Sequence, residues 1–223
     1  MYISHKYKTV FLRSPKTASS SLSEYLIRNI PDPDAVYTPV EDAKIAGTLD
    51  QSIINKYKRN FKYYHFTLQE LVNEKIITEE QAQSYYVFSV LREPLDRQKS
   101  FLYFYARWKA RGKPVTLNHF KEWAPHGYFN GEPNSAMLQT DFLKLNGQIA
   151  GRFWLYEDIS KNLDKLFTIL NIKPTHDMPR HKSDFRKNRE NEIEFDQETI
   201  SKIRSFFWND FEMYRQMRLE RNG

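Results

Sequence analysis

The most informative stretch of this sequence is Thr9-Val-Phe-Leu-Arg-Ser-Pro-Lys-Thr-Ala-Ser-Ser-Ser-Leu22. Its β-branched and apolar start predicts a short buried strand over residues 9–14, followed by the loop 15–21 and a helix. Ser21 and Glu24 have the spacing of a capping box, which predicts that Ser21 caps this helix. Many α/β proteins bind phosphate at such a strand-loop-helix unit, because the N–H groups and the dipole at the helix start attract anions.

The side chains of this loop are also suited to an anion. Lys16 brings a positive charge, and Thr17, Ser19, Ser20 and Ser21 bring hydroxyl donors. A nucleoside-triphosphate loop reads G-x-x-x-x-G-K-[ST], so that its lysine comes late and precedes a metal-binding hydroxyl. Here the lysine comes early and the loop contains no glycine, which favours a phosphosulfate bound without a metal. A serine-rich helix start beside a surface lysine is the alternative for the loop taken alone.

A second strand-to-helix junction occurs in the middle of the chain. The continuous β-branched and aromatic run Tyr85–Val90 predicts a buried strand, and Arg92-Glu-Pro-Leu-Asp-Arg-Gln-Lys-Ser100 opens a helix after it. Arg92 offers a planar fork of donors that fits a phosphate, and Ser100 adds a hydroxyl two turns along the helix. An ordinary helix start with proline at its first position is the alternative for this segment alone.

The remaining elements predict the fold class. A third strand is predicted at 152–156, short helices with capping boxes are predicted after Thr67 and Thr78, and Asp196 is predicted to cap a final helix. Strands that alternate with helices are typical of a parallel sheet covered on both faces. We therefore expect one α/β domain over residues 1–223, with three layers (α/β/α) around a central parallel sheet.

Composition and charge narrow the classes of function. The chain has 223 residues and no cysteine, which excludes disulfides, thiolate metal sites and cysteine nucleophiles. Its net charge of +6 favours an anionic partner, such as a phosphorylated cofactor, an acidic glycan or a nucleic acid. No Lys/Arg run and no nucleic-acid motif is present, so we expect no nucleic-acid partner.

The sequence also predicts where the protein resides. No apolar run approaches the roughly 20 residues that span a bilayer, so we expect no membrane partner. The polar segment 1–8 argues against a signal peptide, and the sequence contains no Asn-x-Ser/Thr sequon. These features together favour a cytoplasmic protein.

The two junctions resemble the donor-binding motifs of one enzyme family. The stretch Arg13–Leu22 is similar to the 5′-phosphosulfate loop of the sulfotransferase superfamily, above all in the glycan-modifying branch that includes the heparan sulfate 2-O-sulfotransferases. The stretch Arg92–Ser100 resembles the 3′-phosphate motif of the family, with Glu93 where Asp or Asn is usual. The resemblance covers residues 9–215 and is weakest across 111–135. It implies a P-loop-like phosphosulfate loop and 3′-phosphoadenosine 5′-phosphosulfate as the sulfonate donor.

The resemblance also implies which residues bind this donor. Arg92 and Ser100 would bind the 3′-phosphate, while Arg97 would support the loop. The segment His181-Lys-Ser183 resembles the closing segment of the family, with His in place of Asn, which implicates Lys182 and Ser183. The residues implied for the phosphosulfate are Arg13, Lys16, Thr17, Ala18, Ser19, Ser20 and Ser21.

Two residues are implied in catalysis. His65 precedes a Thr-Leu-x-Glu-Leu helix, where the family places a histidine near the acceptor, and an imidazole is suited to deprotonating a hydroxyl near neutral pH. A packed or surface histidine is the alternative. Lys16 would stabilise the charge that develops on the leaving phosphate, so that sulfonate is transferred in line to an acceptor hydroxyl without a covalent enzyme intermediate. The sequence offers no compact His/Asp/Glu cluster, so no metal is expected.

Two other functions remain as alternatives at this point. A nucleotide or small-molecule kinase of the P-loop type is disfavoured by the order of residues in the loop, and a basic nucleic-acid-binding module is disfavoured by the absence of its motifs. A glycan or a small molecule could carry the acceptor hydroxyl, and the oligomeric state is left open. The segment Asp210–Tyr214 resembles the terminal Asp-Phe-x-x-Tyr of the family, and we expect it to serve packing.

Overall fold

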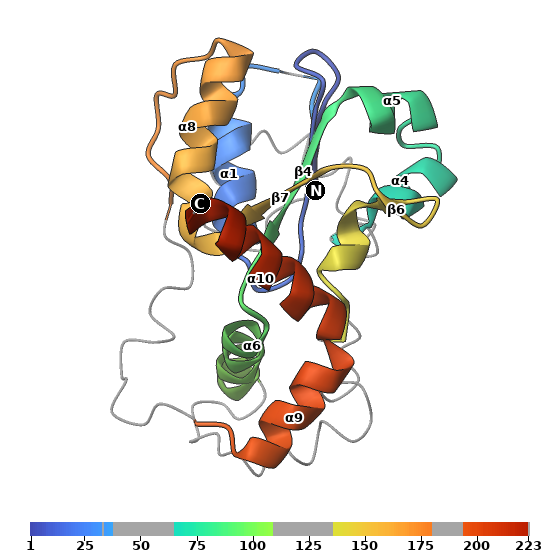
Figure 1. The fold of residues 1–223 in the computed structure, drawn as a ribbon. Coiled ribbons are helices and arrows are strands. Elements are labelled where there is room, and N and C mark those ends of the chain that lie inside the picture. Colours follow the sequence, from blue (N-terminus) through green and yellow to red (C-terminus); the bar gives the residue numbers. More distant parts are fainter. Residues whose placement is uncertain (33, 38–64, 109–135, 180–193, 223) are drawn as a thin grey trace. The chain divides into compact units, whose positions relative to one another are not determined.

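The computed structural model describes residues 1–32, 34–37, 65–108, 136–179 and 194–222 (Figure 1). The chain divides into two compact units, each made of two segments. The first unit comprises Met1–Leu91 and Thr140–His181, and the second comprises Arg92–Gln139 and Lys182–Gly223. Among the residues singled out above, Lys182 and Ser183 lie outside the described part of the chain, as does the segment 111–135.

The first unit is built on a five-stranded sheet with the order β3-β1-β2-β4-β7. The three strands expected from the sequence are present and run parallel, with Leu12 opposite Ser89 and Leu91 opposite Leu155. At one edge the sheet continues with two antiparallel strands, β1 and β3, which no pattern in the sequence predicts. The strand bounds are β1 Tyr2–Ser4, β2 Thr9–Leu12, β3 Val36–Tyr37, β4 Tyr86–Leu91 and β7 Arg152–Leu155.

Two helices cover one face of this sheet. In Figure 1, α1 (Ser19–Asn29) and α8 (Ile159–Leu170) lie side by side, and an edge-to-face contact joins the rings of Tyr25 and Phe167 at 5.5 Å. Beneath them the ring of Phe88 stacks on Trp154 at 3.9 Å and on Phe11 at 5.0 Å. These rings come from three neighbouring strands, so the core of this layer is an aromatic stack.

Shorter elements cover the other face. The helices α4 (Leu68–Asn73) and α5 (Glu79–Ser84) lie across β4 from α1 and α8 in Figure 1, and a 3₁₀ turn, η4 (Thr140–Leu143), contacts both β4 and α4. A hairpin of β5 (Lys144–Leu145) and β6 (Gln148–Ile149) follows η4. Both predicted capping boxes are present, at Thr67 with Glu70 and at Thr78 with Gln81. The first unit therefore has the expected α/β class and its three layers.

The described part of the second unit is helical. It contains α6 (Pro94–Trp108), α9 (Gln197–Phe206) and α10 (Trp208–Asn222), and its core is formed by Leu102, Phe195, Ile203 and Phe207. Asp196 caps α9 as predicted, because its side chain accepts a hydrogen bond from Thr199 N–H at 2.9 Å. The single final helix expected from the sequence is instead two helices, which meet at Phe207. None of the described helices is both long enough and apolar enough to cross a membrane.

Candidate functional site

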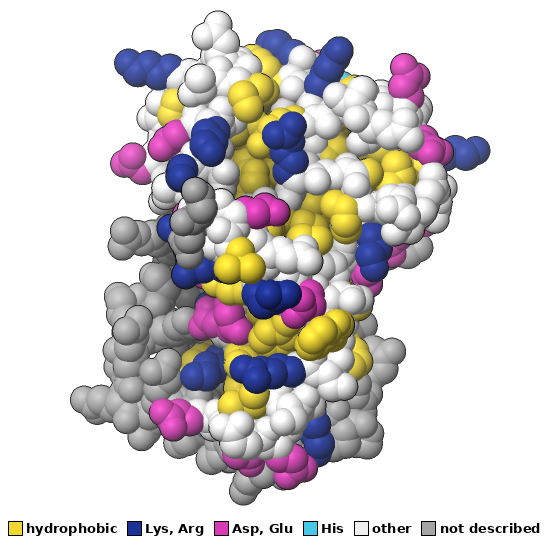
Figure 2. Space-filling view, in the orientation of Figure 1, with side chains coloured by type: hydrophobic (Ala, Val, Ile, Leu, Met, Phe, Trp, Pro, Cys, Tyr) yellow, Lys and Arg dark blue, Asp and Glu magenta, His cyan; other side chains and the backbone are white. Residues whose placement is uncertain are grey.

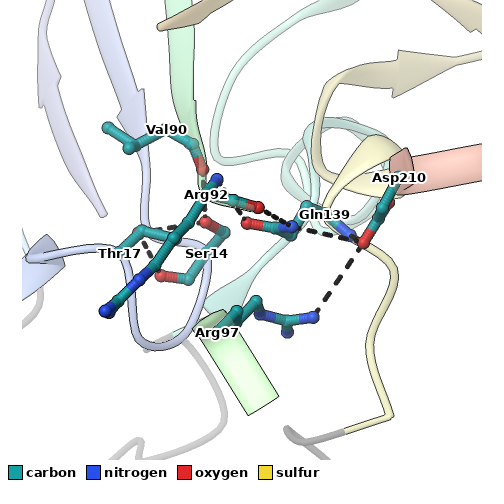
Figure 3. A network of polar contacts seen from close by, with 7 residues as sticks. All are labelled: Ser14, Thr17, Val90, Arg92, Arg97, Gln139 and Asp210. Carbon is teal, nitrogen blue, oxygen red and sulfur yellow. Dashed lines mark hydrogen bonds and ion pairs between the residues drawn. The ribbon is translucent and has the colours of Figure 1, made fainter. Parts of the chain in front are cut away.

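The loop after β2 has an unusual backbone that buried hydroxyls stabilise. Lys16 and Ala18 have φ angles of 65° and 58°, in the left-handed region that residues with a Cβ rarely adopt. Each such residue costs of order 1–3 kcal/mol and persists only where its surroundings hold it. The hydroxyl of Ser14 donates to the carbonyl of Val90 at 2.7 Å, and the hydroxyl of Thr17 donates to the carbonyl of Ser14 at 2.7 Å (Figure 3). The loop is thus held in a strained conformation, as is common for loops that bind a ligand.

The start of α1 is suited to an external anion. The predicted capping box is wrong: α1 begins at Ser19 after Ala18, and no side chain caps it. Glu24 pairs with Arg28 at 2.5 Å instead. The first helical hydrogen bond runs from Leu22 N–H to the carbonyl of Ala18 at 3.0 Å, so the N–H groups of Ser19 and Ser20 precede the hydrogen-bonded ladder of the helix. The first turn contains no acidic residue, so no side-chain carboxylate of this turn competes with an external anion for the positive end of the helix dipole.

The charged residues of the loop lie close to this helix start in the chain. Arg13 is buried, and its Nη2 donates to Oγ of Ser20 at 3.1 Å, so it bridges the end of β2 and the first turn of α1. Lys16, which lies between Arg13 and Ser20 in the chain, is half-buried. The hydroxyl of Thr17 donates to the carbonyl of Ser14 and lies 3.0 Å from the Ser14 hydroxyl, so it is used within the loop. Two cationic side chains and a helix start therefore belong to one short segment.

His65 is joined to the same loop. Its Nδ1 lies 2.7 Å from the carbonyl oxygen of Arg13. A carbonyl only accepts hydrogen bonds, so Nδ1 carries the proton, and Nε2 of the neutral ring has the lone pair that can take a proton. Two residues further on, Thr67 begins α4 with its capping box. The structure therefore brings the predicted base to the first residue of the predicted phosphosulfate loop, in the tautomer that general-base chemistry requires.

Arg92 directly follows β4 in the chain, and an acidic residue orients its side chain. Arg92 is 5% exposed, and its Nε and Nη2 lie 2.6 and 2.5 Å from the same oxygen of Asp96. Asp96 itself is partly exposed. The guanidinium of Arg92 is thus held in one orientation from within its own segment, and Ser100 lies half-buried two turns along α6.

Glu93, which stands where the resemblance leads us to expect Asp or Asn, caps the start of α6. The first hydrogen bond of α6 runs from Arg97 N–H to the carbonyl of Glu93 at 2.9 Å, and the Glu93 side chain accepts from Asp96 N–H at 2.6 Å. Pro94 is the first residue of the helix, a position that tolerates its missing N–H. Burial raises the pKa of the Glu93 carboxyl above its usual value, against the hydrogen bonds that lower it. The Glu93 side chain therefore satisfies the start of α6 as a helix cap.

Arg97 points into the core of the second unit. It is fully buried, 3.9 Å from the carboxylate of Asp210, with its guanidinium 5.2 Å over the ring of Phe101 and 5.7 Å over that of Phe207. Burial lowers the pKa of Arg97 to about 10, although the nearby carboxylate of Asp210 raises it. This placement agrees with a supporting role and differs from that of a side chain that binds a ligand.

Two residues in contact with Arg92 and Arg97 were not identified as site residues from the sequence. Gln139 bonds to the backbone of Arg92, and Asp210 accepts a hydrogen bond from the backbone N–H of Gln139 at 2.8 Å (Figure 3). Asp210 had a signal, because a carboxylate on the apolar stripe of a helix needs a polar partner. Gln139 had none. Among the described residues, no group of three or more metal-binding side chains comes together.

Comparisons with known proteins give the following matches. A family model described as the sulfotransferase family matches residues 1–215. No curated protein sequence matches the chain. A sulfotransferase structure from Alicyclobacillus acidocaldarius is similar, with a TM-score of 0.46 and 13% identity over 91% of this chain and 92% of the other. The mouse sulfotransferase SULT7A1, solved with PAP, has a TM-score of 0.38 and 18% identity over 93% of this chain and 66% of the other.

Proposed function

The chain belongs to the sulfotransferase family, which transfers sulfonate from 3′-phosphoadenosine 5′-phosphosulfate to a hydroxyl, and on this basis we propose which of its residues carry out each part of the reaction. The observation that carries the proposal is the 2.7 Å hydrogen bond between Nδ1 of His65 and the carbonyl of Arg13. It joins a side chain capable of acting as a base to a loop whose helix start and cations are suited to an anion.

The loop after β2 binds the 5′-phosphosulfate. The N–H groups at the start of α1 and the positive end of its dipole favour an anion, and the charges of Arg13 and Lys16 add to this field. The left-handed backbone at Lys16 and Ala18 supports the proposal, because alternating backbone conformations direct successive N–H groups to one side. The residues assigned to this group are Arg13, Lys16, Thr17, Ala18, Ser19, Ser20 and Ser21.

The 3′-phosphate is bound by Arg92 and Ser100, as the resemblance of their segment implies. A guanidinium that is already oriented by Asp96 loses little freedom when it binds a phosphate. Lys182 and Ser183 are assigned to the donor by resemblance alone. Each of the two proposed anion-binding groups therefore follows the end of a parallel strand, β2 or β4.

His65 is the general base. The acceptor hydroxyl gives its proton to Nε2 while its oxygen forms a bond to sulfur. The bond between sulfur and the bridging oxygen of the 5′-phosphate breaks, and adenosine 3′,5′-bisphosphate leaves. Lys16 stabilises the negative charge that develops on this bridging oxygen. Because cationic side chains carry this charge, the reaction needs no metal, and activity should be insensitive to EDTA.

The acceptor and the setting are further parts of the proposal. The acceptor is a glycan or a small molecule with a hydroxyl group, and the protein acts in the cytoplasm without a membrane or nucleic-acid partner. On the face drawn in Figure 2, Lys and Arg side chains alternate with Asp and Glu and form no continuous stripe.

A transfer assay tests the assignment of the base. Wild-type protein, His65→Ala and His5→Ala are incubated with ³⁵S-labelled donor and a panel of glycan and small-molecule hydroxyls. His5→Ala is the matched control, because His5 is exposed and its ring bonds to Tyr85. We expect transfer by the wild type and His5→Ala, and a loss of about 10²–10⁴ in kcat for His65→Ala with donor affinity unchanged. Near-normal kcat in His65→Ala would show that another group is the base.

A further inference from the structure

We propose that Gln139 is a positioning residue for Arg92, and that Asp210 on α10 sets the orientation of the Gln139 amide. The inference rests on the proposed role of Arg92 in binding the 3′-phosphate. All of the residues that carry it belong to the second unit, and the sequence places Asp210 118 positions after Arg92. It gives the C-terminal helix a part in the recognition of the donor.

The side chain of Gln139 binds both backbone polar groups of Arg92. Its Oε1 accepts from Arg92 N–H at 2.9 Å, and its Nε2 donates to the Arg92 carbonyl at 2.9 Å (Figure 3). The paired register of β4 with β7 ends at Leu91, so the backbone of Arg92 lies just beyond the ladder of the sheet. Buried backbone groups need partners, and a primary amide can accept with one atom and donate with the other. Gln139 thus does for Arg92 what a neighbouring strand would do.

Asp210 determines which way the amide of Gln139 faces. Its Oδ2 accepts from the backbone N–H of Gln139 at 2.8 Å and lies 3.4 Å from Nε2 of the same residue. A carboxylate offers only acceptors, so the NH₂ end of the amide faces Asp210 and the oxygen faces Arg92 N–H. Reversing the amide would bring oxygen against oxygen at both the Asp210 carboxylate and the Arg92 carbonyl. One orientation is therefore selected.

The burial of these groups makes their arrangement rigid. Gln139, Asp210 and Arg97 are each 0% exposed, and Arg97 lies 3.9 Å from the Asp210 carboxylate as its counter-charge. Away from water, hydrogen bonds and charges interact more strongly, and breaking one leaves a costly buried polar group. Arg92 is consequently held at its backbone by Gln139 and at its guanidinium by Asp96.

This arrangement has a measurable consequence for the ligand. Adenosine 3′,5′-bisphosphate and 5′-AMP differ by the 3′-phosphate. The dissociation constant of 5′-AMP divided by that of the bisphosphate therefore reports on the group that binds the 3′-phosphate. Replacing a residue that only stabilises the fold leaves this ratio unchanged in the folded protein. Replacing a residue that positions Arg92 lowers the ratio and leaves the affinity for 5′-AMP unchanged.

Calorimetry on the full chain tests the inference with the wild type, Arg92→Ala, Gln139→Leu and Gln139→Glu. Asp196→Ala is the matched control, because it destabilises the same unit by removing the cap of α9, the hydrogen bond from Thr199 N–H. We expect the bisphosphate to bind the wild type more tightly than 5′-AMP, and the ratio to fall about tenfold in both Gln139 variants. Asp196→Ala should keep the wild-type ratio.

The Gln139→Glu variant adds a test that distinguishes a positioning role of Gln139 from a purely structural one. When it is ionised, its carboxylate repels Asp210 and the Arg92 carbonyl, but a protonated carboxyl can donate to that carbonyl. Its ratio should therefore recover toward the wild-type ratio, measured at the same pH, as the pH is lowered. This isosteric variant also decides the matter if Gln139→Leu does not fold.

The possible failures are distinct. A wild type that binds both nucleotides equally, or an Arg92→Ala variant that keeps the wild-type ratio, would overturn the role of Arg92 and this inference with it. Folded Gln139 variants that keep the wild-type ratio, while Arg92→Ala loses it, would overturn the positioning role alone.

Discussion

Arg13 and His65 are 52 residues apart in the sequence and are joined by one hydrogen bond. The bond uses the backbone of Arg13, whereas the side chain of Arg13 donates to Ser20 on α1. A single residue therefore connects the strand end, the helix start and the proposed base. The sequence could predict the chemistry of His65 from its type, but the contact with Arg13 depends on how the first unit folds.

At the same scale, Lys16→Ala should reduce both donor affinity and kcat. Lys16 carries a full charge beside the start of α1, where the proposed phosphosulfate lies, and the same charge stabilises the leaving oxygen in the transition state. Removal of one such electrostatic contact lowers kcat by about 10²–10³. Titration calorimetry with adenosine 3′,5′-bisphosphate and single-turnover transfer separate the two effects. A Lys16→Ala variant with an unchanged rate of transfer at saturating donor would refute the role at the leaving oxygen.

Among the elements, helix starts with a side-chain cap were predictable at Thr67, Thr78 and Asp196, whereas the start of α1 was not. Thr67 and Thr78 form their capping boxes with residues three positions away, so the pattern is complete in the sequence. Ser21 and Glu24 have the same pattern, but α1 begins earlier because Ala18 adopts a left-handed conformation. The serines that resemble a cap therefore lie inside the helix.

Long-range pairings account for most of what the sequence did not predict. The strand Tyr2–Ser4 is only three residues long, and its burial follows from pairing with β2 and β3. The bonds of Gln139 to Arg92 also join residues far apart in the chain. By contrast, β4 was predictable because a strand buried on both faces is apolar throughout.

The start of α6 should make stability depend on pH. Burial raises the pKa of Glu93 in the folded chain, so the native state binds more protons than the unfolded state from pH 4.5 up to that raised pKa. Stability falls as pH rises through such a window. Glu93→Gln lacks this contribution. Urea unfolding should show the wild type losing stability relative to Glu93→Gln as pH increases above 4.5, and a difference that stays constant or changes in the opposite sense would contradict this.

For the whole molecule, we expect one cooperative unfolding transition. Each unit consists of two separate segments, and the chain passes between the units after Leu91, Gln139 and His181. Neither unit can therefore be removed as a continuous piece, and we predict that residues 1–223 unfold as a single domain. Calorimetry should give a calorimetric enthalpy equal to the van't Hoff enthalpy. Two resolved transitions would show that the units unfold independently.

The choice of acceptor should depend on the segments 38–60 and 111–135, both outside the described residues. The donor is proposed to bind at helix starts that follow parallel strands, so the acceptor must approach the same end of the sheet. For an anionic acceptor, replacing Lys56, Lys58 and Lys113 by alanine should raise KM and weaken its salt dependence, with donor binding unchanged. Exchange of 111–135 with the segment of a relative of different specificity provides the check. A folded chimera that binds donor and keeps the original preference would place recognition elsewhere.

Thermal unfolding of the wild-type chain with different ligands measures whether its anion sites are built for the sulfonate donor. Adenosine 3′,5′-bisphosphate, ATP with magnesium, and an oligonucleotide are each added at the same large excess. The bisphosphate should stabilise the fold, by about 2.7 kcal/mol at a hundredfold excess over its dissociation constant. ATP with magnesium and the oligonucleotide should leave the melting temperature nearly unchanged. Stabilisation by either of them equal to that by the bisphosphate would contradict a site specialised for 3′-phosphoadenosine 5′-phosphosulfate.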